Sequence, residues 1–384
     1  MVVRKHVDRV AAPYVDRVLA EAHAVARYLG HRPVARLHLG GGTPNYLGVP
    51  ALRRLLEGLS ERFAPTEDAE WAIECDPRQA TPEETEAIFS LGFNRLSVGV
   101  QDFDPAVQAA IGRRQSFEET RRVVEAARAA GARSVNVDLV YGLPAQSEAR
   151  LARTLERVLA LSPDRLAVFS FAYVPQIRPH QKKIDPARLP PPEAKARMLV
   201  RVIETLTGAG YVQVGMDHFA RQSDPLARSL RAGTLFRSFQ GYEPGPELEL
   251  VGLGATAIGD IGGAYVQNHH RLGAYEAAVD AGRLPVERGL ARSPDDQIRR
   301  EVIASILCRF ELSFDALAAR HGIDHDRYFR DALPELERLE AEGLLHRHPR
   351  GLTLTPLGRL FVRNVAMAYD AYRGRLGARF SRTV

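Results

Sequence analysis

A run of three glycines, followed by Thr43 and Pro44, comes directly after an apolar stretch in this sequence. The apolar stretch covers residues 34–39 and the glycines occupy 40–42. Because glycine has no Cβ, its backbone amide and carbonyl groups can approach a ligand closely. Glycine-rich turns at strand ends often cradle a phosphate or a zwitterionic group. A tight turn without a ligand uses the same residues, so this motif alone leaves both interpretations open.

Charged side chains follow other apolar stretches at equivalent positions. Glu74 lies at the end of stretch 71–75, where its carboxylate suits either a ribose hydroxyl or a structural ion pair. Asp138 stands between apolar neighbours, so it needs a partner or a ligand to offset its desolvation. Arg113 suits the binding of a carboxylate, although a solvated surface position is equally compatible with a single arginine. Further residues at the ends of these stretches are Asp76, Gln101, Asp102, 141–144, Ala172 and Tyr173.

The two cysteines do not form a metal-binding or disulfide pattern. Cys75 and Cys308 are far apart and neither belongs to a CxxC pair. Two cysteines in 384 residues provide no disulfide framework, and such residues are typically buried small hydrophobes. The residue types alone therefore assign no metal ligand and no catalytic acid or base.

Composition and charge indicate a folded protein of the cytoplasm. Hydrophobic residues make up 45% and charged residues 26%, which is ordinary for a globular chain. No apolar stretch approaches the length that spans a membrane, and residues 1–10 contain no signal-peptide core. The net charge of +5 is mild for this length and suits an anionic small-molecule substrate as well as a nucleic acid.

Helices and strands that position these residues alternate along the first half of the chain. A helix with apolar spacing over 15–29 ends at Gly30. Apolar strands are expected at 34–39, 71–75, 95–100, 135–140 and 166–171. Helices are expected at 49–63, 81–92, 116–131 and 147–161. This alternation predicts a parallel α/β sheet with helices on its outer face, and it favours a barrel or partial barrel over an open doubly wound sheet. A barrel of this kind begins with a strand, whereas this chain opens with a helix.

The second half of the chain is less regular. Residues 174–192 are rich in Pro, Arg, Lys and His and indicate a long functional loop, and 221–262 are expected to be irregular. A helix at 193–209 and a strand at 211–214 are expected between these two segments. A capped helix begins at Ser293, and a small hairpin follows over 344–354. We therefore expect two domains, with a barrel and substrate-side loops over 1–290 and a helical domain resembling a winged helix over 291–384.

Several long stretches make the family of this sequence recognisable. They closely resemble the oxygen-independent coproporphyrinogen III oxidases (dehydrogenases), which are radical S-adenosylmethionine enzymes. The stretches are LHLGGGTPNYL (37–47), ECDPRQATPEE (74–84), GFNRLSVGVQDFDPAVQAAIGR (92–113), VNVDLVYGLPAQ (135–146), GMDHFA (215–220) and FQGYE (239–243). The resemblance extends over essentially the whole chain, and the last two stretches favour this subfamily over the related haem chaperones.

The resemblance implies a fold and a set of cofactors. The expected fold is a partial parallel (β/α)6 barrel with a helical C-terminal domain, here without the first strand. The expected cofactors are one [4Fe–4S] cluster and two molecules of S-adenosylmethionine. By the same resemblance, Gly41 and Glu74 touch the cluster-bound S-adenosylmethionine, and Ile258 lines its adenine side. The residues implied for the second molecule are Gly42, Thr43, Gln101, Arg113, Asp138 and Ala172.

The implied reaction converts coproporphyrinogen III to protoporphyrinogen IX in haem biosynthesis. A 5′-deoxyadenosyl radical removes a hydrogen from a propionate side chain, and loss of CO2 leaves a vinyl group. The basic residues of the long loop suit a substrate with four propionates, although a solvated basic surface explains them equally well. These residues are Arg178, His180, Lys182 and Lys183. The family also implies a flavodoxin or ferredoxin as electron donor and a monomeric protein, with no nucleic acid or membrane partner.

The sequence departs from the family in one respect. The family holds its cluster with three thiolates in a CxxxCxxC motif, and no such motif occurs here. One interpretation is that the true start lies upstream and that the chain is N-terminally truncated. The alternative is a non-catalytic paralogue that binds S-adenosylmethionine or a porphyrin. We favour truncation because the other motifs are intact, and we expect the chain as written to be poorly soluble or inactive.

A nucleic-acid-binding function through the C-terminal domain is a third hypothesis. The hairpin over 344–354 is compatible with the wing of a winged helix. However, Lys and Arg do not concentrate on one recognition helix, which disfavours this function.

Overall fold

The computed structural model describes residues 7–30 and 32–373, and it divides into two compact units. The first unit combines residues up to 169 with 184–198 and 249–291, and the second combines 170–183, 199–248 and the remainder of the chain from 292. Two segments that precede residue 290, 170–183 and 199–248, belong to the second unit. None of the described helices is long and apolar enough to cross a membrane.

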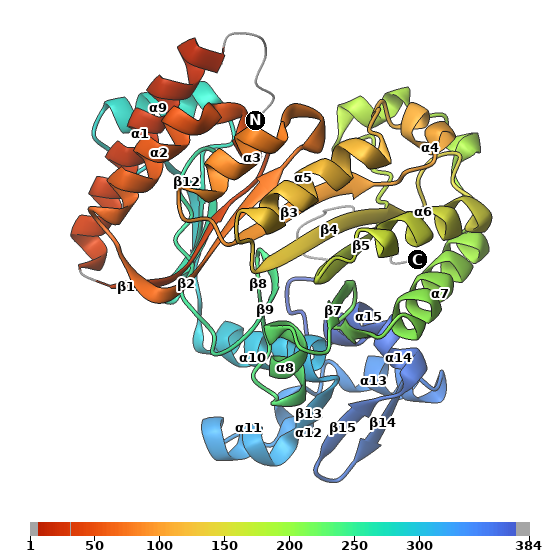
Figure 1. The fold of residues 1–384 in the computed structure, drawn as a ribbon. Helices are drawn as coiled ribbons and strands as arrows, with labels where there is room; N and C mark the ends of the chain where they lie inside the picture. Colours follow the sequence, from red (N-terminus) through yellow and green to blue (C-terminus); the bar gives the residue numbers. More distant parts are fainter. Residues whose placement is uncertain (1–6, 31, 374–384) are drawn as a thin grey trace. The chain divides into compact units, whose positions relative to one another are not determined.

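The first unit is built on strands that follow one another in space as they do in sequence (Figure 1). They are β1 (Pro33–Leu39), β2 (Ala64–Cys75), β3 (Arg95–Gln101), β4 (Ser134–Tyr141) and β5 (Arg165–Ser170). Strands β1 to β4 pair in parallel, with Leu39 opposite Ile73 and Gly99 opposite Asp138. The predicted parallel sheet is confirmed, and its register brings the carboxyl ends of the strands to one edge.

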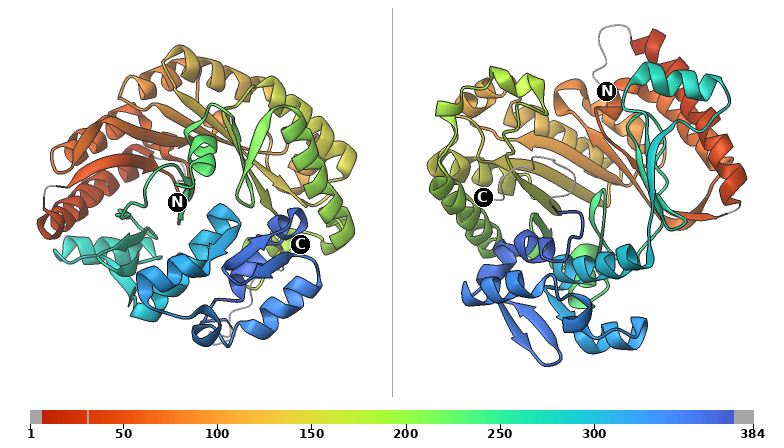
Figure 2. Two further views of the ribbon diagram at one scale, coloured as in Figure 1. Left: turned by 90° about the horizontal axis from the view of Figure 1, so that it is seen from below. Right: turned by 180° about the vertical axis from the view of Figure 1, so that it is seen from behind.

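Helices connect these strands and cover one face of the curved sheet, as Figure 2 (left) shows. They are α1 (Val7–Leu29), α2 (Gly48–Ser60), α3 (Pro82–Phe89), α4 (Pro105–Ala110), α5 (Phe117–Ala129) and α6 (Glu148–Ala160). The helix α7 (Pro192–Gly208) continues from the first unit into the second. Short 3-10 helices lie in the connections between these elements, at Pro44–Leu47, Pro77–Gln79, Pro179–Lys183 and Pro186–Arg188.

The predicted helix boundaries rest on local hydrogen bonds that the structure contains. Thr81 and Glu84 form a reciprocal capping box at the start of α3, and Ser116 and Glu119 do the same for α5. Gly30 follows α1 with a φ of +65°, a conformation that glycine adopts without a steric penalty. The sequence therefore specifies where these helices begin and end.

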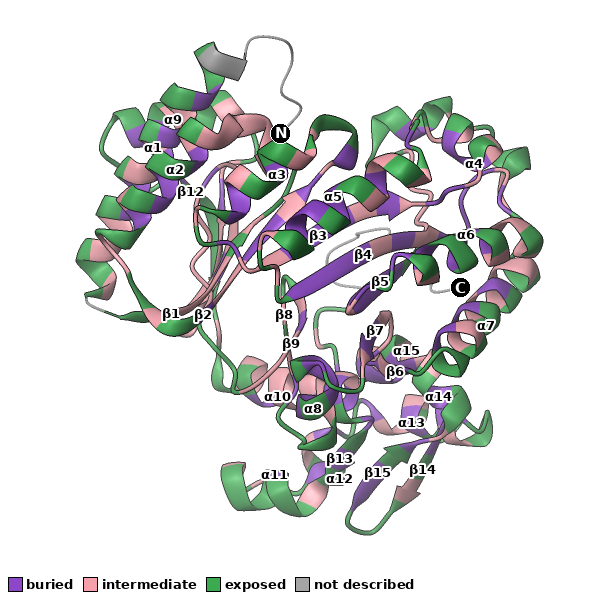
Figure 3. Cartoon of the chain, in the orientation of Figure 1, coloured by how far each residue is buried: buried purple, intermediate pink, exposed green. Residues whose placement is uncertain are grey.

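The core of the first unit lies between the sheet and its helices. Strands β3 and β4 are buried over most of their length (Figure 3), and Val98, Val137 and Leu139 have no exposed surface. Burying one such side chain contributes roughly 1.5–3 kcal/mol to folding, so these strands anchor the sheet. The apolar face of α1, with Val15 and Ala22, packs on α2.

Residues 249–291 form a small antiparallel sheet and a helix in the first unit. The elements are β10 (Ile258–Ile261), β11 (Ala264–Asn268), α9 (Leu272–Asp280) and β12 (Val286–Ala291). The prediction that 221–262 is irregular is wrong, because this segment also holds α8 (Pro225–Arg231), β8 (Phe236–Ser238) and β9 (Gly241–Glu243). These elements have seven residues or fewer, which is too short for a periodic apolar pattern to emerge between glycines and prolines.

The described part of the second unit contains a helical part and the antiparallel hairpins 211–221, 236–243 and 345–354. Strand β6 (Tyr211–Val214), which the sequence predicts, pairs in antiparallel fashion with β7 (His218–Arg221). The predicted C-terminal hairpin is confirmed as β14 (Leu345–His348) and β15 (Gly351–Leu354), and β13 (Glu311–Ser313) pairs with β15. The helices of this part are α10 (Pro294–Arg309), α11 (Phe314–His321), α12 (His325–Tyr328), α13 (Leu333–Ala341), α14 (Pro356–Leu360) and α15 (Val362–Met367).

Candidate functional site

The glycine turn after β1 meets the end of β2 through a hydrogen bond. The amide of Gly41 donates to Oε2 of Glu74 at 3.2 Å, and Nε2 of His38 lies 3.1 Å from Oε1 of the same carboxylate. Gly41 has a φ of +77°, and a Cβ at Gly40 would overlap both His38 and Glu74. The turn therefore needs glycine for its conformation and for its close approach to Glu74. Glu74 is half-buried beside a partly exposed backbone cradle.

Arg113 lies beside the ends of β2 and β3. Its guanidinium donates to the carbonyl oxygen of Gly99 at 2.5 Å and to Oε1 of Gln115 at 2.6 Å. The carboxylate of Asp76 is 3.9 Å away and also accepts hydrogen bonds from Arg78. Burial and the charge of Arg78 lower the pKa of Arg113. Burial alone would raise the pKa of Asp76, but the bonds from Arg78 and the charge of Arg113 leave it below its ordinary value. The arrangement fixes a guanidinium at the strand ends.

Gln101 and Asp138 lie next to Gly99 on the same edge. Gln101 has a φ of +66°, a strained conformation for a non-glycine residue, and the pairing of β3 with β4 shifts between Gly99 and Gln101. Asp138 pairs in register with Gly99. Nδ2 of Asn136 donates to Oδ1 of Asp138 at 2.8 Å and to Oγ of Ser97. Backbone strain of this kind clusters at functional sites, and here it coincides with a convergent set of polar groups.

Asp102 has a structural role. It is fully buried and accepts hydrogen bonds of 2.6 Å each from Thr154 Oγ1, Gln146 Nε2 and the amide of Asp104. Burial raises its pKa, while these bonds act in the opposite direction. The carboxylate therefore ties the loop after β3 to the loop after β4 and to α6, and it does not face a ligand.

The remaining predicted residues lie in several places. Gly42 and Thr43 continue the glycine turn, and Thr43 precedes the short helix at Pro44–Leu47 without capping it through its side chain. Ile258 begins β10, and Leu253, five residues before it, packs against the core cluster of α1 and α2, as Leu39 of β1 also does. Ala172 belongs to the second unit, where its carbonyl oxygen accepts a hydrogen bond from Gln181. The structure thus brings together the residues of β1 to β4 in the first unit.

Asn136 and Lys195 lie near the site and are not among the sequence predictions. Asn136 orients Asp138 through a hydrogen bond. Residues two positions apart lie on the same face of a strand, so the spacing of Asn136 and Asp138 is a sequence signal for this contact. Lys195 of α7 packs its aliphatic chain close to Gly142, with Nζ 6.0 Å from the ring centre of Tyr141. Burial lowers the pKa of Lys195. No sequence pattern links Lys195 to the end of β4, because 53 residues separate it from Gly142.

The cysteines are unsuited to metal binding. Cys75 and Cys308 are both buried free thiols, and burial raises the pKa of each to about 12. Metal ligation requires the thiolate, which these environments disfavour. Across residues 7–30 and 32–373, the structure contains no cluster of three or more His, Cys, Asp or Glu side chains suited to a metal ion.

Comparisons with known proteins agree on one family. The model of the radical SAM superfamily matches residues 5–158, and that of the HemN C-terminal domain matches 293–361. The oxygen-independent coproporphyrinogen III oxidase of Pseudomonas aeruginosa is 44% identical over 97% of this chain and 82% of its own length. The Escherichia coli enzyme of the same name is 41% identical over 94% of this chain and 79% of its own length.

A solved structure extends this similarity to the fold. It is that of coproporphyrinogen III oxidase (HemN) from Escherichia coli, a radical SAM enzyme. It matches with a TM-score of 0.93 and 40% sequence identity, over 97% of this chain and 85% of that chain.

Proposed function

The chain belongs to the family of oxygen-independent coproporphyrinogen III oxidases, and from this membership we propose that it acts in the oxidative decarboxylation of coproporphyrinogen III to protoporphyrinogen IX. The observation that carries the proposal is 44% identity along 97% of the chain to a relative of that name. The similarity includes the strand-end residues as well as the C-terminal domain. The reaction belongs to porphyrin biosynthesis.

The strand-end residues fit S-adenosylmethionine, which the radical SAM superfamily uses together with a [4Fe–4S] cluster. When bound, S-adenosylmethionine supplies a 5′-deoxyadenosyl radical. The exposed backbone of Gly40–Gly42 forms a turn in which a Cβ at Gly40 would overlap His38 and Glu74, and Glu74 offers an acceptor for an amine or a ribose hydroxyl. Arg113 is held so that it can neutralise a carboxylate, and Asn136 orients Asp138. These residues bind and orient the ligand, while the buried β3 and β4 beneath them exclude water from one side.

We assign the predicted residues to two ligand positions by their resemblance to the motifs of the family. Gly41, Glu74 and Ile258 belong to one S-adenosylmethionine. Gly42, Thr43, Gln101, Arg113, Asp138 and Ala172 belong to the second. The hydrogen bond between Gly41 and Glu74 supports the first group, and the convergence of Gln101, Arg113 and Asp138 on Gly99 supports the second.

The described residues do not fit the iron–sulfur cluster. Both thiols of the chain are buried and disfavour the thiolate, and they belong to different units. We therefore derive no step of the reaction through the cluster. The disagreement keeps open a second function, in which the chain is a non-catalytic paralogue that binds S-adenosylmethionine or a porphyrin.

The charge of one loop suits the proposed substrate, and the partners are proposed from the resemblance to the family. Arg178, His180, Lys182 and Lys183 are exposed in the segment 170–183, where cationic groups suit the propionates of the substrate. An electron donor such as flavodoxin or ferredoxin and a monomeric state are part of the proposal. Neither a nucleic acid nor a membrane is proposed as a partner, and the proposed compartment is the cytoplasm.

A binding and product assay under anaerobic conditions tests the function. The purified chain, treated with iron and sulfide, is incubated with S-adenosylmethionine, a reductant and coproporphyrinogen III, and porphyrins are separated after oxidation. We expect saturable binding of S-adenosylmethionine and of coproporphyrinogen III. Formation of protoporphyrin IX would assign catalysis to the chain as given, whereas binding without product is expected of any chain that lacks the cluster thiolates, the paralogue included. Absence of binding of both ligands would contradict the proposed function.

A further inference from the structure

A buried carboxylate on α1 bonds to the segment that leads into Ile258. Glu21 has 3% of its surface exposed. Its Oε2 accepts hydrogen bonds from the amide of Gly254 at 2.8 Å and from the hydroxyl of Tyr275 at 2.7 Å. Its Oε1 accepts a hydrogen bond of 2.6 Å from Nδ2 of Asn268. Three donors from the 249–291 segment therefore converge on one side chain of the first helix.

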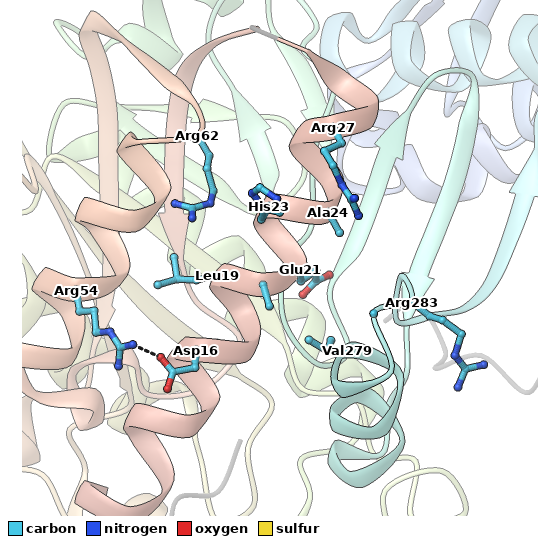
Figure 4. A pocket seen from close by; sticks show the side chains of 12 residues that line it. Asp16, Leu19, Glu21, His23, Ala24, Arg27, Arg54, Arg62, Val279 and Arg283 are labelled. Carbon is cyan, nitrogen blue, oxygen red and sulfur yellow. Dashed lines mark ion pairs between the residues drawn. The ribbon is translucent and has the colours of Figure 1, made fainter.

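The direction of the Glu21 side chain sets it apart from its neighbours on α1. Figure 4 shows Glu21 on the side of α1 that faces Val279 of α9, whereas Asp16 lies on the opposite side with Arg54. Asp16 and Arg54 form an exposed ion pair. The exposed pair lies within reach of water, but the Glu21 carboxylate is enclosed by protein donors. Burial raises the pKa of Glu21, and the hydrogen bonds from Gly254, Tyr275 and Asn268 act in the opposite direction.

The segment that Glu21 holds has a demanding backbone conformation. Gly254 has a φ of +96°, and Thr256 has a φ of +68°, which is strained for a side chain branched at Cβ. A Cβ at Gly252 would overlap the backbone of Ile258, so the turn folds back against its own last residue. Such a conformation persists only where the surroundings over-determine it. The hydrogen bonds that the amide of Gly254 donates to Glu21 and the amide of Ala255 donates to Tyr14 supply that constraint.

Simple packing between α1 and α9 does not require this carboxylate. A buried acid costs desolvation energy that an apolar side chain of similar volume avoids. Hydrogen bonds fix direction as well as distance, whereas apolar contacts tolerate sliding. The use of a carboxylate with three donors at this place therefore favours a role in setting the position of the turn.

We propose that Glu21 is a positioning residue for the S-adenosylmethionine site, because it fixes the turn 252–258 and thereby the place of Ile258. The inference rests on the proposed function, in which Ile258 lines the adenine side of the ligand. Asn268 links Glu21 to the turn, because its Nδ2 donates hydrogen bonds both to Glu21 and to the carbonyl oxygen of Gly254. Glu21 itself does not touch the ligand and takes no part in the chemistry.

The test compares binding of S-adenosylmethionine and of 5′-deoxyadenosine by wild type, Glu21→Ala and Glu21→Gln, well below the melting temperature. Glu21→Ala is expected to lower the affinity for both ligands about tenfold, because both contain adenine. Glu21→Gln keeps one acceptor oxygen for Gly254 and is expected to restore part of the affinity. Tyr275→Phe removes a single donor to Glu21 and serves if Glu21→Ala fails to fold. Hydrogen exchange at 251–258 is expected to rise in the same order as affinity falls.

Two controls separate positioning from general destabilisation. Glu276→Gln removes the ion pair of a neighbouring carboxylate with Arg17 and leaves the turn intact. Val124→Ala creates a cavity in the core beside α5 and is expected to lower the melting temperature, while it leaves the segment 251–258 unchanged. The inference about Glu21 would be overturned if Glu21→Ala bound the ligands as tightly as the wild type, or if Val124→Ala lost as much affinity as Glu21→Ala. Neither result would overturn the proposed function. Absence of binding by the wild type would overturn the proposed function, and the inference with it.

Discussion

The amide of Gly41 donates a hydrogen bond to Oε2 of Glu74 at 3.2 Å and so joins the turn after β1 to the end of β2. These two residues are 33 positions apart in sequence and meet because the strands are parallel neighbours in register. Each belongs to a motif that is unremarkable alone, a glycine turn and a strand-end acid. Their contact converts two weak sequence patterns into one candidate ligand site.

Removal of the Glu74 carboxylate should weaken S-adenosylmethionine binding. A hydrogen bond to a charged group contributes about 1.5–3 kcal/mol, which corresponds to a loss of roughly ten- to a hundredfold in affinity for Glu74→Ala. Glu74→Gln should lose less, because it retains an oxygen acceptor for Gly41. Equilibrium dialysis with labelled ligand measures the effect, and Glu67→Gln on the exposed part of β2 is the control. Unchanged affinity in Glu74→Ala would remove Glu74 from the site.

A methyl group at Gly40 should disrupt the same turn. The added Cβ would overlap the ends of the His38 and Glu74 side chains, so Gly40→Ala is expected to displace the Glu74 carboxylate and to weaken ligand binding about tenfold. Gly273→Ala is the matched control, because its Cβ on α9 meets nothing within 4 Å and should stabilise the helix by roughly 0.5 kcal/mol. Normal binding by Gly40→Ala would mean that the turn is not a ligand cradle.

Both thiols should resist alkylation in the native protein. Burial raises the pKa of Cys75 and Cys308 to about 12, so at pH 8 nearly all of each thiol is protonated and shielded. Mass spectrometry after iodoacetamide treatment should detect no modification of the folded protein and two modifications after unfolding. Rapid labelling of Cys75 in the native state would disagree with its buried position in β2.

The ion pairs of Glu70 should make stability depend on pH. Glu70 of β2 lies 2.7 Å from Arg95 and 3.7 Å from Arg165, whose side chain has 1% exposure. Burial alone would raise the pKa of Glu70, but the two arginines bring it below its ordinary value of 4.5. A lowered pKa in the folded state means that the stabilisation is complete above pH 4.5 and is lost as the pH falls through the folded pKa.

Glu70→Gln should therefore destabilise the protein most at neutral pH. We expect a loss of about 2 kcal/mol at pH 7, less than the roughly 3–5 kcal/mol for a fully buried pair, because Glu70 is partly exposed. Thermal unfolding of the variant and wild type across pH 3–8 measures the difference, which should shrink below pH 4. A difference that stays constant with pH would show that the carboxylate charge is not responsible.

The parallel sheet and its helix boundaries were predictable because they depend on local patterns. Strand 135–140 carries valine or leucine at positions 135, 137, 139 and 140, and helix starts such as Thr81 and Ser116 carry their capping acids three positions later. Parallel pairing places the carboxyl ends of the strands at one edge of the sheet. The grouping of Glu74 with Gly41 therefore followed from the topology. The edge itself could be predicted before any distance was known.

The support around the site could not be predicted in this way. Glu21 and Gly254 are 233 positions apart, and an acid at one position of an amphipathic helix normally faces water. Asp102 follows a strand as Glu74 does, yet it is buried by Thr154 and Gln146, which come from later loops and helices. Only long-range packing distinguishes a ligand-facing carboxylate from a structural one.

Hydrogen exchange with and without S-adenosylmethionine locates the ligand and tests the central claim most directly. If the carboxyl edge of β1 to β4 binds it, exchange should slow in the peptides over 40–47, 74–80, 99–103 and 136–142. Peptides from α11 to α13 should exchange at the same rate in both samples. Protection confined to residues outside this edge, or no protection at saturating ligand, would contradict the account.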